Sequence, residues 1–240
     1  MLDWKRPLVA GLTALGTLII SASANAQSSN APKPPPDTME ARVMACAACH
    51  GVQGAGLDNN YFPRLAGRPA GYLYEQLRAF RDGTRSYAPM NALLAYLSDD
   101  YLHKMAEYYA AQQPPFPPHR GNLRTDAIRE QGRRLVANGD AARGIPACAT
   151  CHGASLTGLE PGIPGLLGLN ASYLSGQLGE FRAHTRRGAR PDCMANVAAK
   201  LSDADITAVS AYLAAQPKPA DAAPARQTAE LPLVCGSQAR

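Results

Sequence analysis

The chain has 240 residues, with 24 Lys and Arg against 19 Asp and Glu and a formal net charge of +5. An apolar fraction of 46% is enough for a packed core, and the length suits one large domain or two small ones. Because the positive residues are scattered, the sequence lacks the basic stripe of a nucleic-acid-binding protein, and we expect no nucleic-acid partner.

The first 26 residues have the pattern of a secretory signal peptide. Lys5 and Arg6 precede a short apolar stretch at 7–22, and Ala-Asn-Ala at 24–26 fits a cleavage site. An uncleaved anchor is the less favoured alternative, because the apolar stretch is short for a span of about 20 residues. We therefore expect a periplasmic protein whose mature chain starts at Gln27, with no stable membrane insertion and at most peripheral association.

The rest of the chain repeats itself, which indicates two homologous domains. Matched residues are separated by 101 to 104 positions throughout. The matched segments include Cys46-Ala47-Ala48-Cys49-His50 with Cys148-Ala149-Thr150-Cys151-His152, Tyr72-Leu73 with Tyr173-Leu174, Met90 with Met194, and Leu97-Ser98-Asp99 with Leu201-Ser202-Asp203. We predict a Pro-rich segment at 27–36, a first domain at 37–113, a Pro-rich linker at 114–124, a second domain at 125–216 and a low-complexity, loosely ordered tail at 217–240.

Each half has the pattern of short helices, and no alternating strand pattern occurs, so both domains are predicted to be all-α. A first helix is expected to begin near Asp37 or Thr38 and run into Cys46, with a counterpart that begins near Thr125 or Asp126. The predicted middle helices are Ala70–Arg81 and Ala171–Arg182, and the predicted last helices begin after the caps Ser98 and Ser202.

Cys-x-x-Cys-His is the attachment signature of a c-type haem. Two thiols on one helical turn can each bond a vinyl group of the same porphyrin, and the following His becomes the proximal iron ligand. A single copy could also be a redox dithiol or half of a zinc site, but the exported repeat has two copies and a zinc site needs further Cys or His ligands. We predict two covalent haem c groups, on Cys46, Cys49 and His50 and on Cys148, Cys151 and His152.

Met90 and Met194 are the candidate sixth ligands of the two irons. Each lies eight residues before the Ser that caps the last predicted helix of its domain. A neutral thioether raises the reduction potential of a haem, and an iron with both His and Met bound has no position for a substrate. The alternative, that these Met residues only fill gaps in the core, is disfavoured by their matched register.

Between Thr38 and Gln216 these motifs resemble the dihaem class I cytochromes c of the cytochrome c-four type. The resemblance implies two tandem class I cytochrome c domains, each wrapping one haem with His/Met ligation. It also implies that a proline carbonyl holds each proximal His in place, and Pro63 and Pro164 match that position.

The same resemblance implies a periplasmic carrier of single electrons rather than an enzyme. A quinol-oxidising complex or a periplasmic dehydrogenase would supply the electrons, and a terminal oxidase or reductase in the membrane would accept them. The alternatives are a fixed cytochrome subunit of a dehydrogenase complex and a dihaem enzyme such as a peroxidase. Arg182, Arg186, Arg187 and Arg190 could supply positive charge for docking, although an ordinary solvated loop is the favoured interpretation.

Two cysteines are left over after the haem bonds, Cys193 and Cys235. In an oxidising compartment we expect them to form a disulfide that fixes the tail against the second domain. The alternative is that Cys193 ligates iron in place of Met194, which would resemble the thiosulfate dehydrogenases and indicate an enzyme. The repeat register favours Met194, because Cys193 aligns with Pro89.

Overall fold

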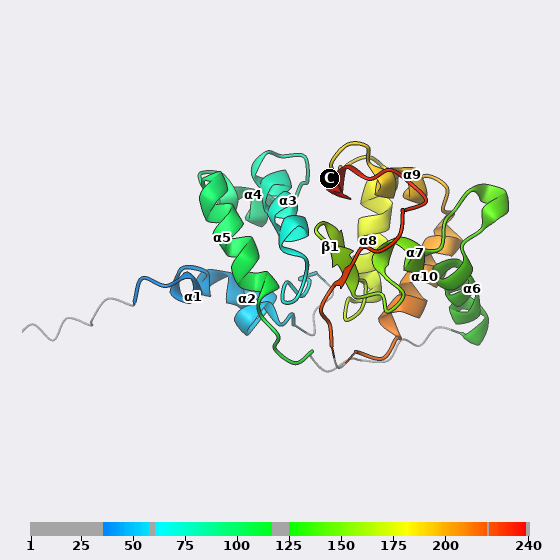
Figure 1. The fold of residues 1–240 in the computed structure, drawn as a ribbon, viewed down its shortest axis with the longest axis horizontal. Coiled ribbons are helices and arrows are strands. Elements are labelled where there is room, and N and C mark those ends of the chain that lie inside the picture. Colours follow the sequence, from blue (N-terminus) through cyan, green and yellow to red (C-terminus); the bar gives the residue numbers. More distant parts are fainter. Residues whose placement is uncertain (1–35, 58–60, 117–124, 220, 239–240) are drawn as a thin grey trace, which may run out of the picture. The chain divides into compact units, whose positions relative to one another are not determined.

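The computed structural model describes residues 36–57, 61–116, 125–219 and 221–238 (Figure 1). Residues 36–240 form one compact unit. The predicted signal peptide at 1–26, almost all of the Pro-rich segment at 27–36 and most of the linker at 114–124 lie outside the described residues. Within the described part, no helix is long and apolar enough to span a bilayer.

The first repeat is built from short helical segments. They are α1 (Met39–Arg42), η1 (Met44–Cys46), α2 (Ala47–His50), η2 (Val52–Gly54), α3 (Ala70–Arg81), α4 (Ala88–Leu94) and α5 (Asp99–Ala110). The predicted start at Thr38 is confirmed, since its hydroxyl accepts a hydrogen bond from the Ala41 amide at 3.2 Å. The helix does not run unbroken to Cys46, however, because the backbone leaves the α-helical region at Val43, where α1 ends.

The second repeat follows the same order with a longer first helix. Its segments are α6 (Asp126–Asn138), η3 (Ala141–Arg143), α7 (Cys148–His152), α8 (Ala171–Arg182), α9 (Cys193–Ala198), α10 (Asp203–Ala214) and the C-terminal η4 (Gly236–Gln238). Thr125 caps α6 and Ser202 caps α10, as the sequence predicts. The predicted middle helices α3 and α8 have the expected bounds.

The two domains are mainly helical, as predicted, and the described residues add three very short strands. They are β1 (Gly158–Glu160), β2 (Ile163–Pro164) and β3 (Ala225–Arg226), in the order β2-β1-β3. β1 pairs antiparallel with β2, with Leu159 opposite Ile163, and parallel with β3, with Leu159 opposite Ala225. The predicted loose tail is therefore wrong for residues 225–226, because their backbone completes a sheet on the second domain.

A separate core stabilises each repeat. In the first, α3 and α5 cross, and Leu73 and Phe80 pack against Leu102, Met105 and Tyr109. In the second, α6 crosses α10, and Leu135 and Val136 pack against Val209 and Leu213. The crossing is close, since a Cβ added at Gly132 of α6 would collide with the Ala208 carbonyl of α10. The loop between α2 and α3 and the loop between α7 and α8 each bring a proline carbonyl next to the histidine of a Cys motif.

Asp205 joins three segments at the start of α10. Its carboxylate accepts hydrogen bonds from the Gln131 amide at 3.1 Å, the Arg143 guanidinium at 2.6 Å and the Ser202 backbone N–H at 3.0 Å. Burial alone would raise the pKa of Asp205, but the hydrogen bonds from Arg143 and Ser202 outweigh it and hold the pKa far below the ordinary value. The folded protein therefore favours the ionised carboxylate.

We expect Asp205→Asn to lower the free energy of unfolding by about 2–3 kcal/mol at pH 7, because hydrogen bonds to a charged group are lost. A group whose folded pKa is depressed contributes stability above its unfolded value of about 3.9 and loses it as the pH falls toward the folded value. Urea unfolding of the wild type and of Asp205→Asn should therefore give free energies of unfolding that differ by the full amount at pH 7 and by less below about pH 4. Asp203→Asn is the control, because that side chain is 89% exposed and its ion pair should contribute less than about 1 kcal/mol. Equal losses of unfolding free energy in the two variants would contradict the stabilising role assigned to the Asp205 carboxylate.

Candidate functional site

Each repeat presents two thiols and an imidazole on one short helical stretch. Cys46 ends η1 and Cys49 lies on α2, while Cys148 and Cys151 both lie on α7. All four are free thiols and partly buried. Burial raises the pKa of Cys148 to about 11 and raises the pKa values of Cys46 and Cys151 as well. None of the four forms a disulfide within the described residues, so each pair is available for two bonds to one porphyrin.

The two histidines are buried and oriented in the same way. His50 Nδ1 lies 2.9 Å from the Pro63 carbonyl oxygen, and His152 Nδ1 lies 2.7 Å from that of Pro164. A ring that donates its Nδ1 proton to a carbonyl leaves Nε2 as the nitrogen that can bind a metal. Burial lowers the pKa of both imidazoles, which favours the neutral form that a metal ligand requires. The predicted proline contact is thus present in both repeats.

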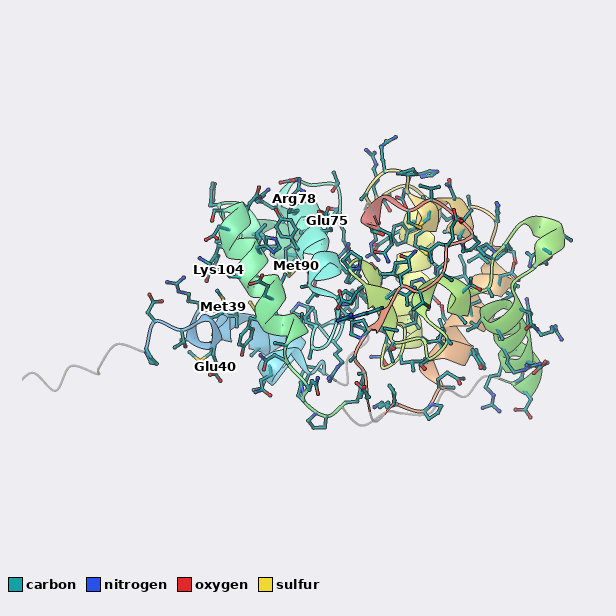
Figure 2. All side chains as sticks on the ribbon, in the orientation of Figure 1. Met39, Glu40, Glu75, Arg78, Met90 and Lys104 are labelled. Carbon is teal, nitrogen blue, oxygen red and sulfur yellow. A yellow bond between two sulfur atoms is a disulfide. The ribbon has the colours of Figure 1, made fainter. Side chains whose placement is uncertain are left out.

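Met90 lies on α4 in the first repeat, beside α3 and α5 (Figure 2). It packs against the same core cluster as Cys46. Met194 lies on α9 and packs against Phe181, Ala195 and Ala198, whereas Cys148 packs against the cluster of Leu174. In the first repeat, Cys46 and Met90 therefore pack against one cluster. In the second repeat, Cys148 and Met194 pack against two different clusters, and both of these include a residue of α8.

The cysteine before Met194 takes part in a disulfide bond. Cys193 forms a disulfide with Cys235, 42 residues further along the chain, which confirms the expected pairing. A disulfide sulfur carries no thiolate, so Cys193 is not available as an iron ligand in this form. The disulfide fixes the C-terminal segment, which we define as residues 221–238, to the start of α9.

A set of six polar residues, here called the arginine cluster, lies between the repeats, with its two arginines buried and its other four side chains half-buried. Arg85 donates to Gln76 at 3.0 Å, Tyr173 at 3.1 Å and Gln177 at 2.5 Å. Arg186 makes the same contacts with the two repeats exchanged, to Gln177 at 2.7 Å, Tyr72 at 3.2 Å and Gln76 at 2.7 Å. The cluster consists of Tyr72, Gln76 and Arg85 and their counterparts 101 positions later, Tyr173, Gln177 and Arg186.

The arginine cluster has the chemistry of an anion site. Both guanidinium groups are buried, and their hydrogen bonds within the described residues go to neutral oxygens only. Burial disfavours ionisation of Tyr72, but the charges of Arg186 and Arg85 outweigh it and lower its pKa. Buried cations require a nearby counter-charge. Glu180 is one such charge beside the cluster, since its carboxylate accepts a hydrogen bond from the Gln177 amide at 3.1 Å. The propionates of a haem would supply more.

Sequence reasoning missed this cluster and misplaced one of its members. The sequence favours a solvated loop or a docking rim for Arg186, but the structure buries it against Tyr72 and Gln76. The signal was available, because Arg186 and Arg85 have the same 101-residue offset as the two tyrosines. A charged residue that recurs at the same offset as the residues of a packed repeat is a candidate for burial itself.

The fold and the paired sites define a tandem of two cytochrome c domains. The cytochrome c family model matches residues 40–119 and 130–217, and the chain belongs to this family as a dihaem class I member of the cytochrome c4 type. Two haem c groups, one in each domain, are therefore attached covalently through the Cys-x-x-Cys-His motifs.

The chain is similar to curated proteins and to a solved structure over most of its length. The thiosulfate dehydrogenase electron acceptor of Thiomonas intermedia is 38% identical over 175 residues, which cover 73% of this chain and 80% of that protein. Cytochrome c4 of Pseudomonas aeruginosa is 39% identical over 176 residues, with 72% and 85% covered. The crystal structure of reduced cytochrome c4 from Pseudomonas stutzeri superposes with a TM-score of 0.64 at 34% identity, covering 73% of this chain and 95% of that one.

Proposed function

We propose that the protein is a periplasmic electron carrier in which both haem irons have His/Met ligation. His50 and Met90 would bind the iron of the first haem, and His152 and Met194 that of the second. The observation that carries the proposal is the repeated set of a thiol pair outside any disulfide, a proximal ring hydrogen-bonded to a proline carbonyl, and a Met in matched register.

Each residue of the set has a separate task in this proposal. Cys46 and Cys49, and Cys148 and Cys151, hold their haems through thioether bonds. The carbonyls of Pro63 and Pro164 fix the tautomer and the orientation of the two rings. The first haem belongs to the domain at 37–113 and the second to the domain at 125–216, joined by the linker at 114–124.

The ligand set supports a carrier rather than an enzyme. An iron with two protein ligands on its axis has no open position for peroxide or another substrate, and it rearranges little on reduction. The disulfide of Cys193 supports the same conclusion, because it removes the thiolate that a thiosulfate dehydrogenase-like site would use. Two haems let one molecule hold two electrons at once.

The names of the relatives favour one electron donor. Two of them are named thiosulfate dehydrogenase electron acceptors, so a thiosulfate-oxidising dehydrogenase is the first donor to test, ahead of a quinol-oxidising complex. A terminal oxidase or reductase would receive the electrons. The signal-peptide pattern supports a periplasmic location, and so does the disulfide, which persists in oxidising compartments.

The first experiment is a pyridine haemochrome assay with an absorption spectrum of the oxidised mature protein. We expect two haems per chain, the far-red band of a Met–Fe(III) bond at two-haem intensity, and two one-electron steps on titration. A thiosulfate dehydrogenase with thiosulfate should reduce both haems, whereas thiosulfate alone should reduce neither. Turnover of peroxide, or a far-red band of half the intensity, would contradict the paired His/Met carrier.

A further inference from the structure

The two repeats differ at the residue after the proximal proline. In the first repeat this residue is Arg64, whose Nε donates to the Ala66 carbonyl at 3.2 Å and whose Nη2 donates to the Pro114 carbonyl at 2.6 Å. The first domain thus fixes its own proximal loop with its own arginine. In the second repeat the equivalent residue, 101 positions later, is Gly165, which has no side chain to do the same.

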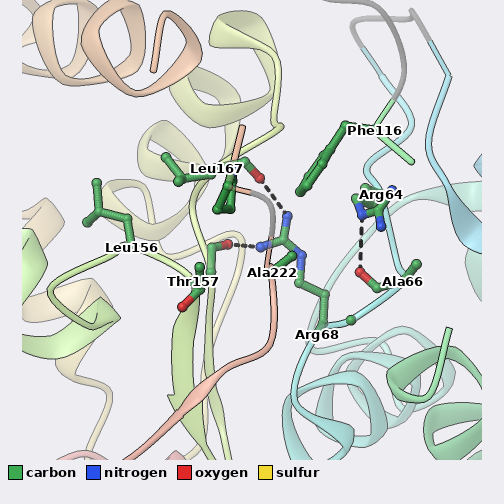
Figure 3. A pocket seen from close by; sticks show the side chains of 11 residues that line it. Arg64, Ala66, Arg68, Phe116, Leu156, Thr157, Leu167 and Ala222 are labelled. Atoms are coloured by element: carbon green, nitrogen blue, oxygen red, sulfur yellow. Dashed lines mark hydrogen bonds between the residues drawn. The ribbon is translucent and has the colours of Figure 1, made fainter. Parts of the chain in front are cut away.

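Arg68 of the first domain takes over this task in the second. Its Nη1 donates to the Gly165 carbonyl and its Nη2 to the Leu167 carbonyl at 3.2 Å (Figure 3). Leu167 is the counterpart of Ala66, the residue that Arg64 contacts in the first repeat. The contact is close, since a Cβ added at Gly165 would lie 2.9 Å from Arg68 Nη1.

The contact works in one direction only. The counterpart of Arg68 in the second repeat is Leu169, which offers no donor to the first domain. Gly165 directly follows Pro164, whose carbonyl holds His152. The first domain therefore fixes the loop that orients the proximal ligand of the second haem, and the second domain does not return the contact.

Arg68 also brings a buried charge to the second haem site. Its side chain is almost fully enclosed, with 7% of the residue exposed, and its hydrogen bonds within the described residues go to carbonyl oxygens. Arg68 Nη1 donates to the carbonyl of Gly165, the residue directly after Pro164, and the Pro164 carbonyl lies 2.7 Å from His152 Nδ1, so the charge is held beside the proximal ligand. A buried cation opposes a further positive charge nearby, and oxidation of a haem from Fe(II) to Fe(III) adds one.

We propose that Arg68 sets the reduction potential of the second haem from the first domain, by fixing the loop at 165–167 and by favouring Fe(II) electrostatically. Arg68 is a positioning residue, and its role rests on the proposed ligation of the second iron by His152. Because the charge acts on one haem, it biases the electron equilibrium toward the second haem. That bias exists only while the two domains are packed together.

The test compares Arg68→Gln, which keeps amide donors but loses the charge, with Arg68→Lys, which keeps the charge. In a spectroscopic redox titration we expect Arg68→Gln to lower the potential of the second haem, to leave the first unchanged, and to reduce the equilibrium constant for electron transfer between them several-fold. Arg68→Lys should restore most of that constant. Arg78→Gln is the matched control, because this guanidinium on α3 is 40% exposed and should affect neither haem.

A second variant keeps the proposal testable if Arg68→Gln does not acquire both haems. Ala222 of the C-terminal segment lines the same pocket as Arg68 (Figure 3), and Ala222→Asp would place a carboxylate beside the intact arginine, with the same expected fall in the second potential. The proposal is overturned if a loaded variant leaves both potentials unchanged or lowers both equally. The carrier function is tested separately, by two haems per chain and two one-electron steps in the titration of the wild-type protein. A failure of the Arg68 proposal can therefore be told apart from a failure of the proposed function.

Discussion

Met90→His should leave both haems attached and lower the potential of one of them by about 100 mV or more, since axial ligands set haem potentials over a range of about 0.8 V. The thioether is a neutral, weak donor that favours Fe(II), whereas an imidazole donates more strongly and favours Fe(III). The thioether bonds of the first haem are on Cys46 and Cys49, so the substitution should not affect attachment. Optical redox titration measures both potentials, and the step that moves identifies the first haem.

Met105→Leu is the matched control for this experiment. Met105 lies in the same core cluster as Met90 but is buried on α5, and Leu has a similar volume, which usually costs less than about 1.5 kcal/mol. Neither potential should move in the control. An unchanged titration of Met90→His would remove Met90 from the ligand set.

Replacing both Cys193 and Cys235 by Ser should lower the free energy of unfolding by about 2–4 kcal/mol, because the bond closes a long loop. The sequence separation is 42 residues, and the loss arises from the greater freedom of the unfolded chain. Both cysteines are replaced together, because a single substitution would leave a thiol beside Met194. Urea unfolding of the oxidised holoprotein measures the loss.

The same double variant should affect the second haem selectively. The C-terminal segment joins both sides of that site: Gln238 bonds the backbone of Glu160 at 3.1 Å and of Gly162 at 3.0 Å, and the Gly236 amide bonds the Pro191 carbonyl at 2.9 Å. It therefore ties the hairpin that ends at Pro164 to the start of α9, which carries Met194. We expect the far-red band of the second haem to weaken while that of the first persists. Equal weakening of both bands would contradict a local role.

Local signals in the sequence predicted the helices and caps that surround the two Cys motifs. The Cys-x-x-Cys-His motifs, the caps at Ser98 and Ser202 and the bounds of α3 and α8 all depend on residues close in the chain, and the structure agrees. Their physical causes, namely hydrogen bonds to the first-turn amides and an apolar face along one helix, act over a few residues. The ligand roles of Met90 and Met194 remain predictions.

Contacts between distant segments were not predictable in this way. The strand β3 forms because residues 225–226 meet β1 more than sixty positions earlier, and two residues are too few for an alternating pattern. The burial of Arg186 also depends on partners elsewhere in the fold. A charged residue in a polar loop has the same sequence pattern whether or not another domain later covers it.

The arginine cluster has the character of an isologous interface. Each domain contributes one Tyr, one Gln and one Arg and receives the same three groups from the other, as two copies do across a twofold axis. Such a contact is self-complementary, because the same set of groups lies on both sides of it. The tandem chain is in this sense a dimer joined by its linker, which keeps the effective concentration of one half near the other high. Covalent joining also allowed the halves to diverge, since an arginine that serves only its neighbour, as Arg68 does, has no place in a symmetric pair.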